Sequence, residues 1–248
     1  MLTQSLSWEV WLNQLKLNKG KGTVNTCLYR KRNIEIRKMK KYTIDQIISK
    51  VRTKLDEIAV NESEMIGTEE DNANLNMVIQ SCVPEAYRFI SLNAHPNMLE
   101  GKQYASGALT IGKDLVGKIG LPGDFLRLLS VRLSSWISSC SVFVDEDSPE
   151  YRMQSNQWVS GNKYKPVAAL VQTGTGRQVE LFKASSTNDE LKSFIYIPVL
   201  ADNYSEVDLS DQTADAFIYY VAALTMVTFR EDVANQFFSV ARNLLGLE

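Results

Sequence analysis

The chain has 248 residues, and 27 Lys and Arg residues against 29 Asp and Glu residues leave a net charge of −2. A hydrophobic content of 44% and a charged content of 23% are those of an ordinary globular protein of one domain or two small ones, which argues against a disordered chain or a coiled-coil rod. Three cysteines and one histidine argue against a disulfide framework, a zinc cluster and a His-based hydrolase, and no apolar run is long enough for a transmembrane helix.

The charge is distributed unevenly along the chain. The first 41 residues contain ten basic and two acidic residues, a net charge of +8, whereas residues 42–248 carry a net charge of −10. We therefore expect a basic N-terminal arm, residues 1–41, on an acidic body. Such an arm suits a phosphate backbone, an anionic membrane or an acidic protein surface, and it is equally typical of a solvated tail. Its densest clusters are Arg30-Lys31-Arg32 and Arg37-Lys38-Met39-Lys40-Lys41.

The apolar residues at the start of the arm predict a short amphipathic helix. Between Leu2 and Leu17 they alternate with polar residues and lack the continuous apolar core of a signal peptide. Trp8 and Trp11 on this helix are candidates for docking into an apolar groove of a partner. Met39 is an alternative natural start that would leave most of the arm out of the mature protein, and both starts remain open.

Two helices are expected after the arm. Thr43 and Gln46 have the spacing of a capping box, and an apolar stripe follows at helical period up to Ile58. A second helix is predicted to start at Thr68 and to carry its stripe as far as Ile90. Pro84 lies inside this second pattern, so we expect a kink rather than a break.

The period changes to that of β-strands in the middle of the chain and returns to a helical period near the end. Thr173-Gly174-Thr175-Gly176 predicts a tight hairpin turn, and two apolar stripes between residues 213 and 245 predict two closing helices. The fold class is therefore α+β, with a helical subdomain from residues 42–120 and 201–248 and a β-rich insertion at 121–200. The expected strands are Phe125–Leu133, Cys140–Val144, Pro166–Gln172, Gln178–Lys183 and Ser193–Leu200.

Catalytic motifs are absent or incomplete. Gly107 to Lys113 matches GxxxxGK, but Asp114 replaces the Ser or Thr that binds Mg²⁺, and no buried strand precedes it. His95 precedes a proline in a polar segment without a nucleophile motif, which is typical of a turn. We therefore expect no catalytic residue, metal or cofactor and no enzymatic activity. An enzyme whose site joins residues distant in sequence remains an alternative.

Several short motifs, in their order along the chain, resemble one protein family. The likeness covers about residues 42–245. Its motifs are Leu121-Pro122-Gly123-Asp124-Phe125-Leu126-Arg127-Leu128, Ser130-Val131-Arg132-Leu133, Trp136, Tyr151, Gln154 and Lys165-Pro166-Val167. This pattern resembles the head–tail connector or neck adaptor (ring) proteins of tailed phages and is most similar to those of crAss-like short-tailed phages. The basic arm is not part of the pattern.

The resemblance implies both a fold and a function. The fold would be a connector-type helical bundle of two N-terminal and two C-terminal helices with the β-rich region inserted. The function would be that of a virion structural protein forming a homo-oligomeric ring, twelvefold by analogy with the portal, that contacts the portal protein and further neck or tail proteins. Genome DNA would pass through the ring without sequence readout. The protein would assemble in the host cytoplasm, reside in the virion and contact no membrane.

Aromatic residues of the insertion are the expected partner interface. Tyr and Trp are enriched at interface cores, although any one of these residues can instead fill the insertion's own core. A nucleic-acid-binding protein acting through the arm remains a further alternative, with binding that weakens steeply with salt. The interface candidates are Trp8, Trp11, Arg30, Lys31 and Arg32 in the arm and Trp136, Tyr151, Trp158 and Tyr164 in the insertion, where Tyr196 and Tyr204 are also expected to be exposed.

Overall fold

The computed structural model describes residues 40–59, 69–104, 108–156, 158–174, 176–227 and 229–247. Within these ranges both helices and strands are present, so the mixed α+β class is confirmed. The interface candidates Trp8, Trp11, Arg30, Lys31 and Arg32 lie outside the described residues, as do the expected helix at the start of the arm and the loop before the second helix. The helices are α2 (Ile44–Ala59), α3 (Glu69–Asn93), the 3₁₀ turn η1 (Pro96–Met98), α4 (Pro149–Met153), α5 (Ala214–Met226) and α6 (Glu231–Leu245).

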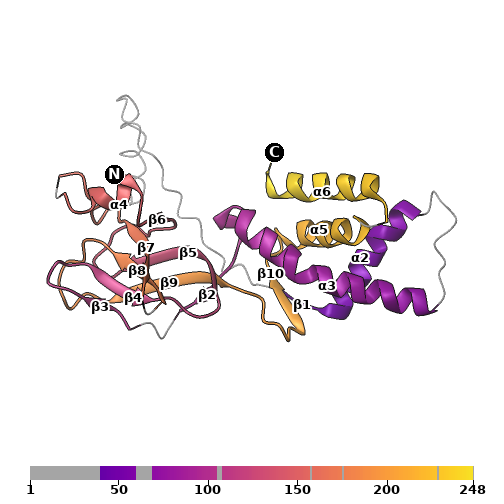
Figure 1. The fold of residues 1–248 in the computed structure, drawn as a ribbon, viewed down its shortest axis with the longest axis horizontal. Helices are drawn as coiled ribbons and strands as arrows, with labels where there is room; N and C mark the ends of the chain where they lie inside the picture. Colours follow the sequence, from indigo (N-terminus) through magenta and orange to yellow (C-terminus); the bar gives the residue numbers. More distant parts are fainter. Residues whose placement is uncertain are drawn as a thin grey trace, which may run out of the picture. The chain divides into compact units, whose positions relative to one another are not determined.

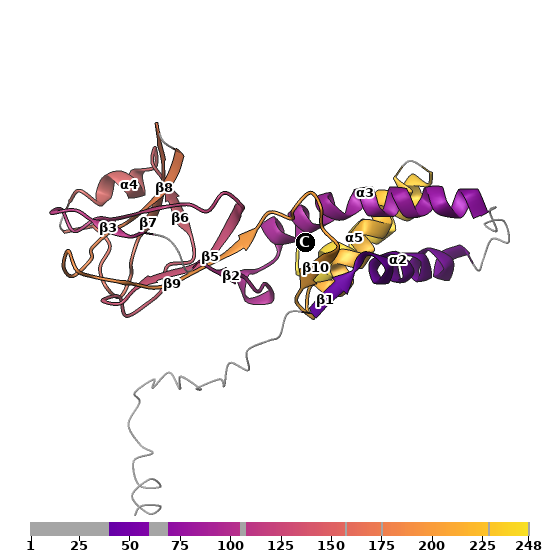
Figure 2. The same ribbon diagram turned by 90° about the horizontal axis from the view of Figure 1, so that it is seen from below.

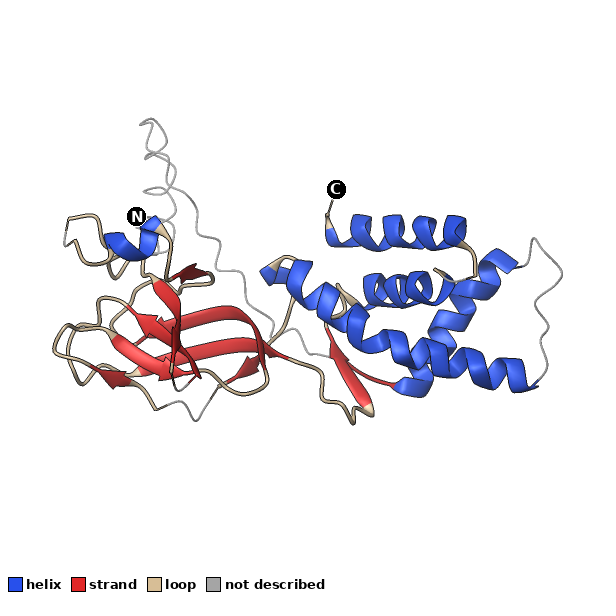
Figure 3. Cartoon of the chain, in the orientation of Figure 1, coloured by secondary structure: helices blue, strands red, loops and turns tan. Residues whose placement is uncertain are grey.

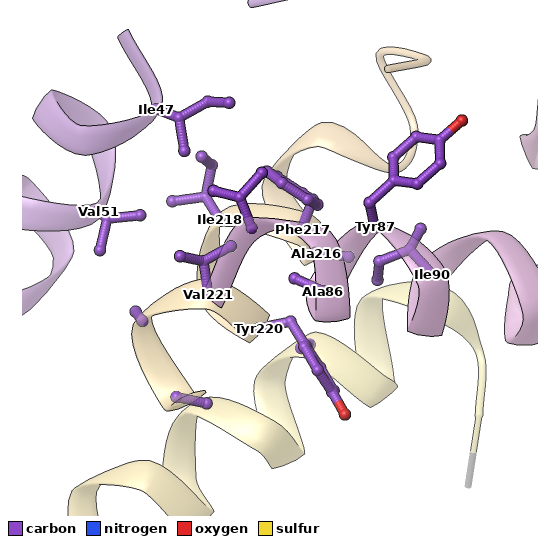
Figure 4. Close-up of a cluster of buried hydrophobic side chains, with 14 of the residues drawn as sticks. Ile47, Val51, Ala86, Tyr87, Ile90, Ala216, Phe217, Ile218, Tyr220 and Val221 are labelled. Carbon is purple, nitrogen blue, oxygen red and sulfur yellow. The ribbon is translucent and has the colours of Figure 1, made fainter. Parts of the chain in front are cut away.

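Four helices from the two ends of the chain share one hydrophobic core. Buried residues of α2, α3, α5 and α6 belong to a single cluster, and Figure 3 shows these helices (blue) gathered together. Helix α5 is central, because ten of its residues are buried. Figure 4 shows how Ile47 and Val51 of α2 and Ala86 and Ile90 of α3 approach it. The two helical pairs therefore pack together despite the long intervening sequence, as their unshielded apolar stripes predict.

The starts and ends of the helices follow from local sequence. The backbone amide of Thr43 donates to Oε1 of Gln46 at 3.2 Å and the amide of Gln46 donates to Oγ1 of Thr43 at 3.3 Å, which confirms the capping box of α2. Helix α3 continues through Pro84 to Asn93, so the expected helix is not broken there. Helix α6 ends at Gly246, whose φ of 69° is a conformation that glycine adopts without strain.

The strands form three sheets. A two-stranded sheet pairs β1 with β10, a three-stranded sheet has the order β2-β9-β5, and a five-stranded sheet has the order β3-β4-β8-β7-β6 (Figure 1). All pairs are antiparallel except β6 with β7. The strands are β1 (Lys40–Thr43), β2 (Lys102–Gln103), β3 (Thr110–Ile111), β4 (Gly117–Gly120), β5 (Phe125–Leu133), β6 (Phe143–Asp145), β7 (Ala168–Thr173), β8 (Gly176–Leu181), β9 (Leu191–Pro198) and β10 (Glu206–Leu209).

The three-stranded and five-stranded sheets enclose a core of their own. Val131 of β5 and Phe194 of β9 are buried in the same cluster as Val179 and Leu181 of β8. A smaller cluster on the other face of β7 and β8 contains Phe182, against which α4 places Tyr151 with the ring centroids 5.7 Å apart. The expected hairpin between β7 and β8 is confirmed, with Thr173 paired to Gly176.

The β-rich region is wider than the sequence indicates. Strands β2, β3 and β4 lie between Lys102 and Gly120, a segment that the sequence assigned to the helical subdomain. They are two to four residues long, too short to have a period of their own, and they form by pairing: β2 with β9, β3 with β4, and β4 with β8. Strand β10, within the C-terminal helical part, likewise forms by pairing with β1.

Arg127 and Tyr87 join the helical core to the three-stranded sheet. Nη1 of Arg127, on β5, donates to the backbone oxygens of Ser91 and Ala94 at 3.0 and 2.8 Å, at the C-terminal end of α3. The hydroxyl of Tyr87, on α3, donates to the carbonyl of Pro198 at the end of β9. Figure 2 shows this junction, where the end of α3 runs toward β2 and β5.

Candidate interaction surface

Three loops at one end of the β-rich region are joined by hydrogen bonds. They are residues 134–142 between β5 and β6, residues 154–165 between α4 and β7, and residues 183–190 between β8 and β9. The backbone amides of Ile137 and Ser138 in the first loop donate to the carbonyl of Lys163 in the second at 2.8 and 3.3 Å. These bonds place residues separated by 25 positions in the sequence next to each other.

Asp189 joins the first loop to the third. Its carboxylate accepts hydrogen bonds from the Ser134 hydroxyl at 2.5 Å, from the Ser135 amide at 3.2 Å and from the Ser135 hydroxyl, and it accepts another from the amide of Ser185 at 3.2 Å. Burial by itself would raise the pKa of Asp189, but these hydrogen bonds together lower the pKa below its usual value. Asp189 is therefore held as a carboxylate that fixes the two loops to each other.

The second loop is ordered by side chains that bond to its own backbone. Oδ1 of Asn162 accepts from the amides of Tyr164 and Lys165 at 2.9 and 3.1 Å, which forms a tight turn with Lys163 and Tyr164 at its tip. A larger residue at Gly161 would crowd this turn, because a Cβ atom there would lie 2.8 Å from Cγ2 of Val167 and 3.0 Å from the carbonyl oxygen of Lys165. The loop is thus ordered without a hydrophobic core of its own.

The joined loops expose an aromatic and basic surface. Trp158 is 85% exposed, Tyr164 59%, Val159 57% and Ile137 50%, while Lys163 and Lys183 are exposed beside them. We call Ile137, Trp158, Val159, Lys163, Tyr164 and Lys183 the three-loop surface. Two of the expected interface residues, Trp158 and Tyr164, belong to it.

A shallow groove of about 430 Å³ lies among the three loops. Trp158 lines it together with the ammonium groups of Lys163 and Lys183 and the serines of all three loops. The backbone of Lys183 has a φ of 64°, a conformation that L-residues rarely adopt and that is often associated with functional sites. An aromatic ring, two cations and several hydroxyls suit a partner surface that is partly apolar and partly anionic.

The expectation that Trp136 and Tyr196 are exposed is wrong. Trp136 is 1% and Tyr196 2% exposed, and both belong to the core between the two sheets. The indole nitrogen of Trp136 donates to the carbonyl of Lys183 at 3.3 Å, so this residue supports the three-loop surface from beneath. Each was read as an interface residue because a single aromatic residue in a polar or alternating segment gives no signal of which face it occupies.

Tyr151 and Tyr204 are partly buried rather than exposed. The Tyr151 hydroxyl donates to Oε2 of the buried Glu180 at 2.9 Å, and burial followed by this carboxylate raises the pKa of Tyr151 to about 12. Glu180 also pairs with Lys118, with Nζ and Oε1 3.2 Å apart. The Tyr204 hydroxyl donates to the carbonyl of Gln80 on α3. Their hydroxyls therefore hold elements of the fold together.

The end of the basic arm that the structure describes faces acidic residues of the same chain. Nζ of Lys40 lies 2.7 Å from Oδ1 of Asp211, and Nζ of Lys41 lies 3.1 Å from Oε2 of Glu206 on the paired strand β10. Hydrogen bonding to Asp211 and Glu206, respectively, raises the pKa of each lysine. Both lysines are exposed, so these pairs are solvent-screened and contribute little stability.

The two residues considered for catalysis occupy structural positions. Lys113 and Asp114 lie in the turn between β3 and β4, where Asp114 accepts from the amide of Val116, so no helix follows the GxxxxGK sequence. A phosphate loop needs a strand before it and a helix after it. His95 precedes η1, and its Nδ1 accepts from the amide of Asn97 at 3.3 Å, as expected for a turn residue.

The described residues contain no group of three or more His, Cys, Asp or Glu side chains placed to share a metal ion. No helix among them combines the length and the hydropathy of a membrane span.

No protein-family model matches the chain, and no curated protein matches it significantly. The class of site must therefore be inferred from its geometry. That geometry is an ordered loop surface that Asp189 and Asn162 hold together and on which Trp158 and Tyr164 are exposed.

Sequence reasoning missed Asp189, Ile137 and Lys183. Asp189 lies in the polar run Ser185-Ser-Thr-Asn-Asp-Glu190, which reads as an ordinary loop. Its importance depends on two serines more than 50 positions away, so no local signal could have identified it.

Proposed function

We propose that this protein is a non-enzymatic structural subunit of the neck of a tailed phage, forming a ring of identical copies below the portal. The three-loop surface is the observation that carries the proposal, because a pre-ordered loop surface with exposed Trp158 and Tyr164 suits the binding of another protein. A shallow, open groove suits such a role better than it suits the binding of a small substrate.

The sequence motif that resembles the phage neck proteins gives a second argument for the proposal. In the stretch Leu121–Leu128, Asp124 accepts a hydrogen bond from the Tyr196 hydroxyl at 2.8 Å, and Arg127 bonds to the end of α3. Arg127 therefore fixes how the helical core and the three-stranded sheet are joined, and Asp124 fixes the start of β5 to β9 within that sheet. A ring subunit needs such a fixed junction, because its neighbours contact both parts.

The helical arrangement is also consistent with the connector-type bundle that the resemblance implies. Helices α2 and α3 from one side of the β-rich region and α5 and α6 from the other form one core. In a subunit of this design the helices form the wedge between neighbours and the β-rich region reaches along the ring.

The proposal is tested on purified phage particles. Quantitative mass spectrometry is expected to find the chain in equal copy number with the portal protein, and labelling with a specific antibody is expected at the head–tail junction. Absence of the chain from particles that carry a complete portal would overturn the proposal.

A matched pair of variants tests whether the three-loop surface matters for attachment. Particles made with Trp158→Ala are expected to lose the chain from the neck. Particles made with Lys113→Ala, an exposed change in the β3–β4 turn, are expected to keep it. Nucleotide hydrolysis that disappears in Lys113→Ala would instead indicate an enzyme.

A further inference from the structure

The three-loop surface exposes more apolar area than isolated surface residues normally do. Its four apolar or aromatic members are each at least half exposed, with Trp158 at 85%. They come from two loops that the Lys163 carbonyl holds together, so they form one patch. Contiguous exposed patches of this kind mark interaction sites, and Trp and Tyr carry much of the binding energy at such sites.

The same surface is basic and has no acidic counterpart of its own. Lys163 and Lys183 of this surface, and the neighbouring Lys165, are exposed and form no ion pair with any residue that the structure describes. Lys163 instead lies over the ring of Tyr164, with Nζ 5.3 Å from the ring centroid. Asp189, the carboxylate in the same loop as Lys183, is occupied by the two serines of the first loop. A partner for this surface therefore needs carboxylates.

A surface that offers exposed carboxylates exists on the helical core. No Lys or Arg occurs between Lys192 and Arg230. Lys40 and Lys41 pair with two of the carboxylates there, and the others form no ion pair with the described part of the chain. Val199, which is 52% exposed, precedes them as an apolar contact point. We call the exposed residues Asp202, Glu206, Asp208, Asp211 and Asp215 the acidic face.

We propose that the three-loop surface of one copy docks on the acidic face of a second copy. This inference rests on the proposed ring, for which it names the two halves of the subunit interface. The two surfaces belong to different hydrophobic cores, the acidic face to the helical core and the three-loop surface to the β-rich region. An interface between two different surfaces is head-to-tail, and it generates a ring when the rotation closes.

Sedimentation velocity on the full-length protein tests this pairing. The wild type is expected to associate as its concentration rises toward about 1 mM and to dissociate as salt screens the charges. The double variant Lys163→Glu/Lys183→Glu and the double variant Asp202→Lys/Asp208→Lys are each expected to remain monomeric. Their equimolar mixture is expected to associate again into heterodimers and longer alternating assemblies, because the intact lysines of one variant meet the intact acidic face of the other and the reversed charges meet each other.

Two further variants test whether association depends on the three-loop surface itself rather than on any change of charge. Lys192→Glu/Arg177→Glu makes the same charge change at exposed positions of the β-rich region outside the three-loop surface, and it is expected to associate like the wild type. Trp158→Ala is expected to weaken association at least tenfold. An unchanged melting temperature in every variant shows that the fold is intact.

Three results would overturn the inference. The first is a wild type that stays monomeric throughout this concentration range. The second is a mixture of the two double variants that shows no heterodimer. The third is an association that requires an added oligonucleotide, which would assign the three-loop surface to nucleic acid. If the chain is nevertheless found in the phage neck, the proposed function stands without this interface. If the copies associate as described but the chain is absent from the particle, the interface stands and the proposed function is overturned.

Discussion

At the scale of single residues, Trp136 and Trp158 show how one residue type serves two purposes. Trp136 is 1% exposed and its indole nitrogen bonds to the carbonyl of Lys183, whereas Trp158 is 85% exposed above the groove. Both lie in Ser-rich polar segments of the sequence. Only the packing of the two sheets distinguishes the core tryptophan from the exposed one.

Replacing these two residues is expected to have opposite consequences. Trp136→Ala removes a fully buried ring and should lower the free energy of unfolding by about 3–5 kcal/mol. Trp158→Ala should change it by less than about 0.5 kcal/mol, because the ring makes few contacts in the free protein. Urea denaturation followed by far-UV circular dichroism measures both values, and a large loss in Trp158→Ala would show that its exposure is overestimated.

Asp189 gives a pH-dependent contribution to stability. Its pKa is lower in the folded protein than the value of about 3.9 expected for an unfolded chain, so folding favours the charged form. The stabilisation is therefore fully present above about pH 4 and is lost as the pH falls through the folded pKa.

Asp189→Asn is expected to lower the free energy of unfolding at neutral pH by about 1–3 kcal/mol, because charged hydrogen bonds to Ser134, Ser135 and Ser185 are weakened. The difference from the wild type should narrow below about pH 4, where the wild-type carboxylate also becomes protonated. Glu190→Gln, at the exposed neighbouring position, serves as the control and should change the value by less than about 0.5 kcal/mol. A pH-independent difference would contradict the assigned role.

At the scale of elements, Arg127 connects strand β5 to the end of helix α3, two elements that are far apart in the sequence. It lies on β5, and its guanidinium donates to the carbonyls of Ser91 and Ala94 at the end of α3, where helix carbonyls have no intrahelical partner. The end of α3 is thereby capped from a strand that follows it by more than 30 residues.

Arg127→Met keeps the apolar stem and removes the donors, and it is expected to cost about 1–3 kcal/mol of stability. Arg177→Met on β8, at an exposed arginine, should stay within about 0.5 kcal/mol of the wild type. Hydrogen exchange of the last turn of α3 should accelerate in Arg127→Met alone. Equal effects of the two substitutions would mean that the cap is not a specific contact.

At the scale of the whole molecule, the two hydrophobic cores meet at the three-stranded sheet. The helical core joins α2 and α3 to α5 and α6 and also contains Leu129 of β5 and Ile197 of β9, whereas the described residues of the core between the sheets come from none of these four helices. The N-terminal helices therefore depend on α5, and the core between the sheets is built without it.

A chain truncated after Gln212 is expected to lose the helical core and to keep the β-rich core. Without α5, the buried faces of α2 and α3 have no partner, and short isolated helices are only marginally stable in water. Hydrogen exchange should then be fast in α2 and α3 and remain slow in β5, β8 and β9. Slow exchange in α2 and α3 would show that the two helices fold as an independent pair.

Local sequence determined several features of this protein. The capping box of Thr43 and Gln46, the passage of α3 through Pro84, the β7–β8 turn and the period of the long strand β5 all follow from short-range sterics and hydrogen bonds within a few residues. The charge asymmetry was likewise visible without a structure.

The tertiary structure alone decided the rest. Strands β2 and β4 form because β9 and β8 offer them backbone partners, and β3 in turn pairs with β4. Trp136 is buried because two sheets close over it, and Asp189 matters because Ser134 and Ser135 reach it from another loop. Each of these features depends on residues distant in sequence. Whether a side chain is buried or paired is decided by the residues that contact it, and local sequence does not show which residues those are. The candidate surface belongs to this second group, since Trp158 and Tyr164 were visible in the sequence but the loops that hold them together were not.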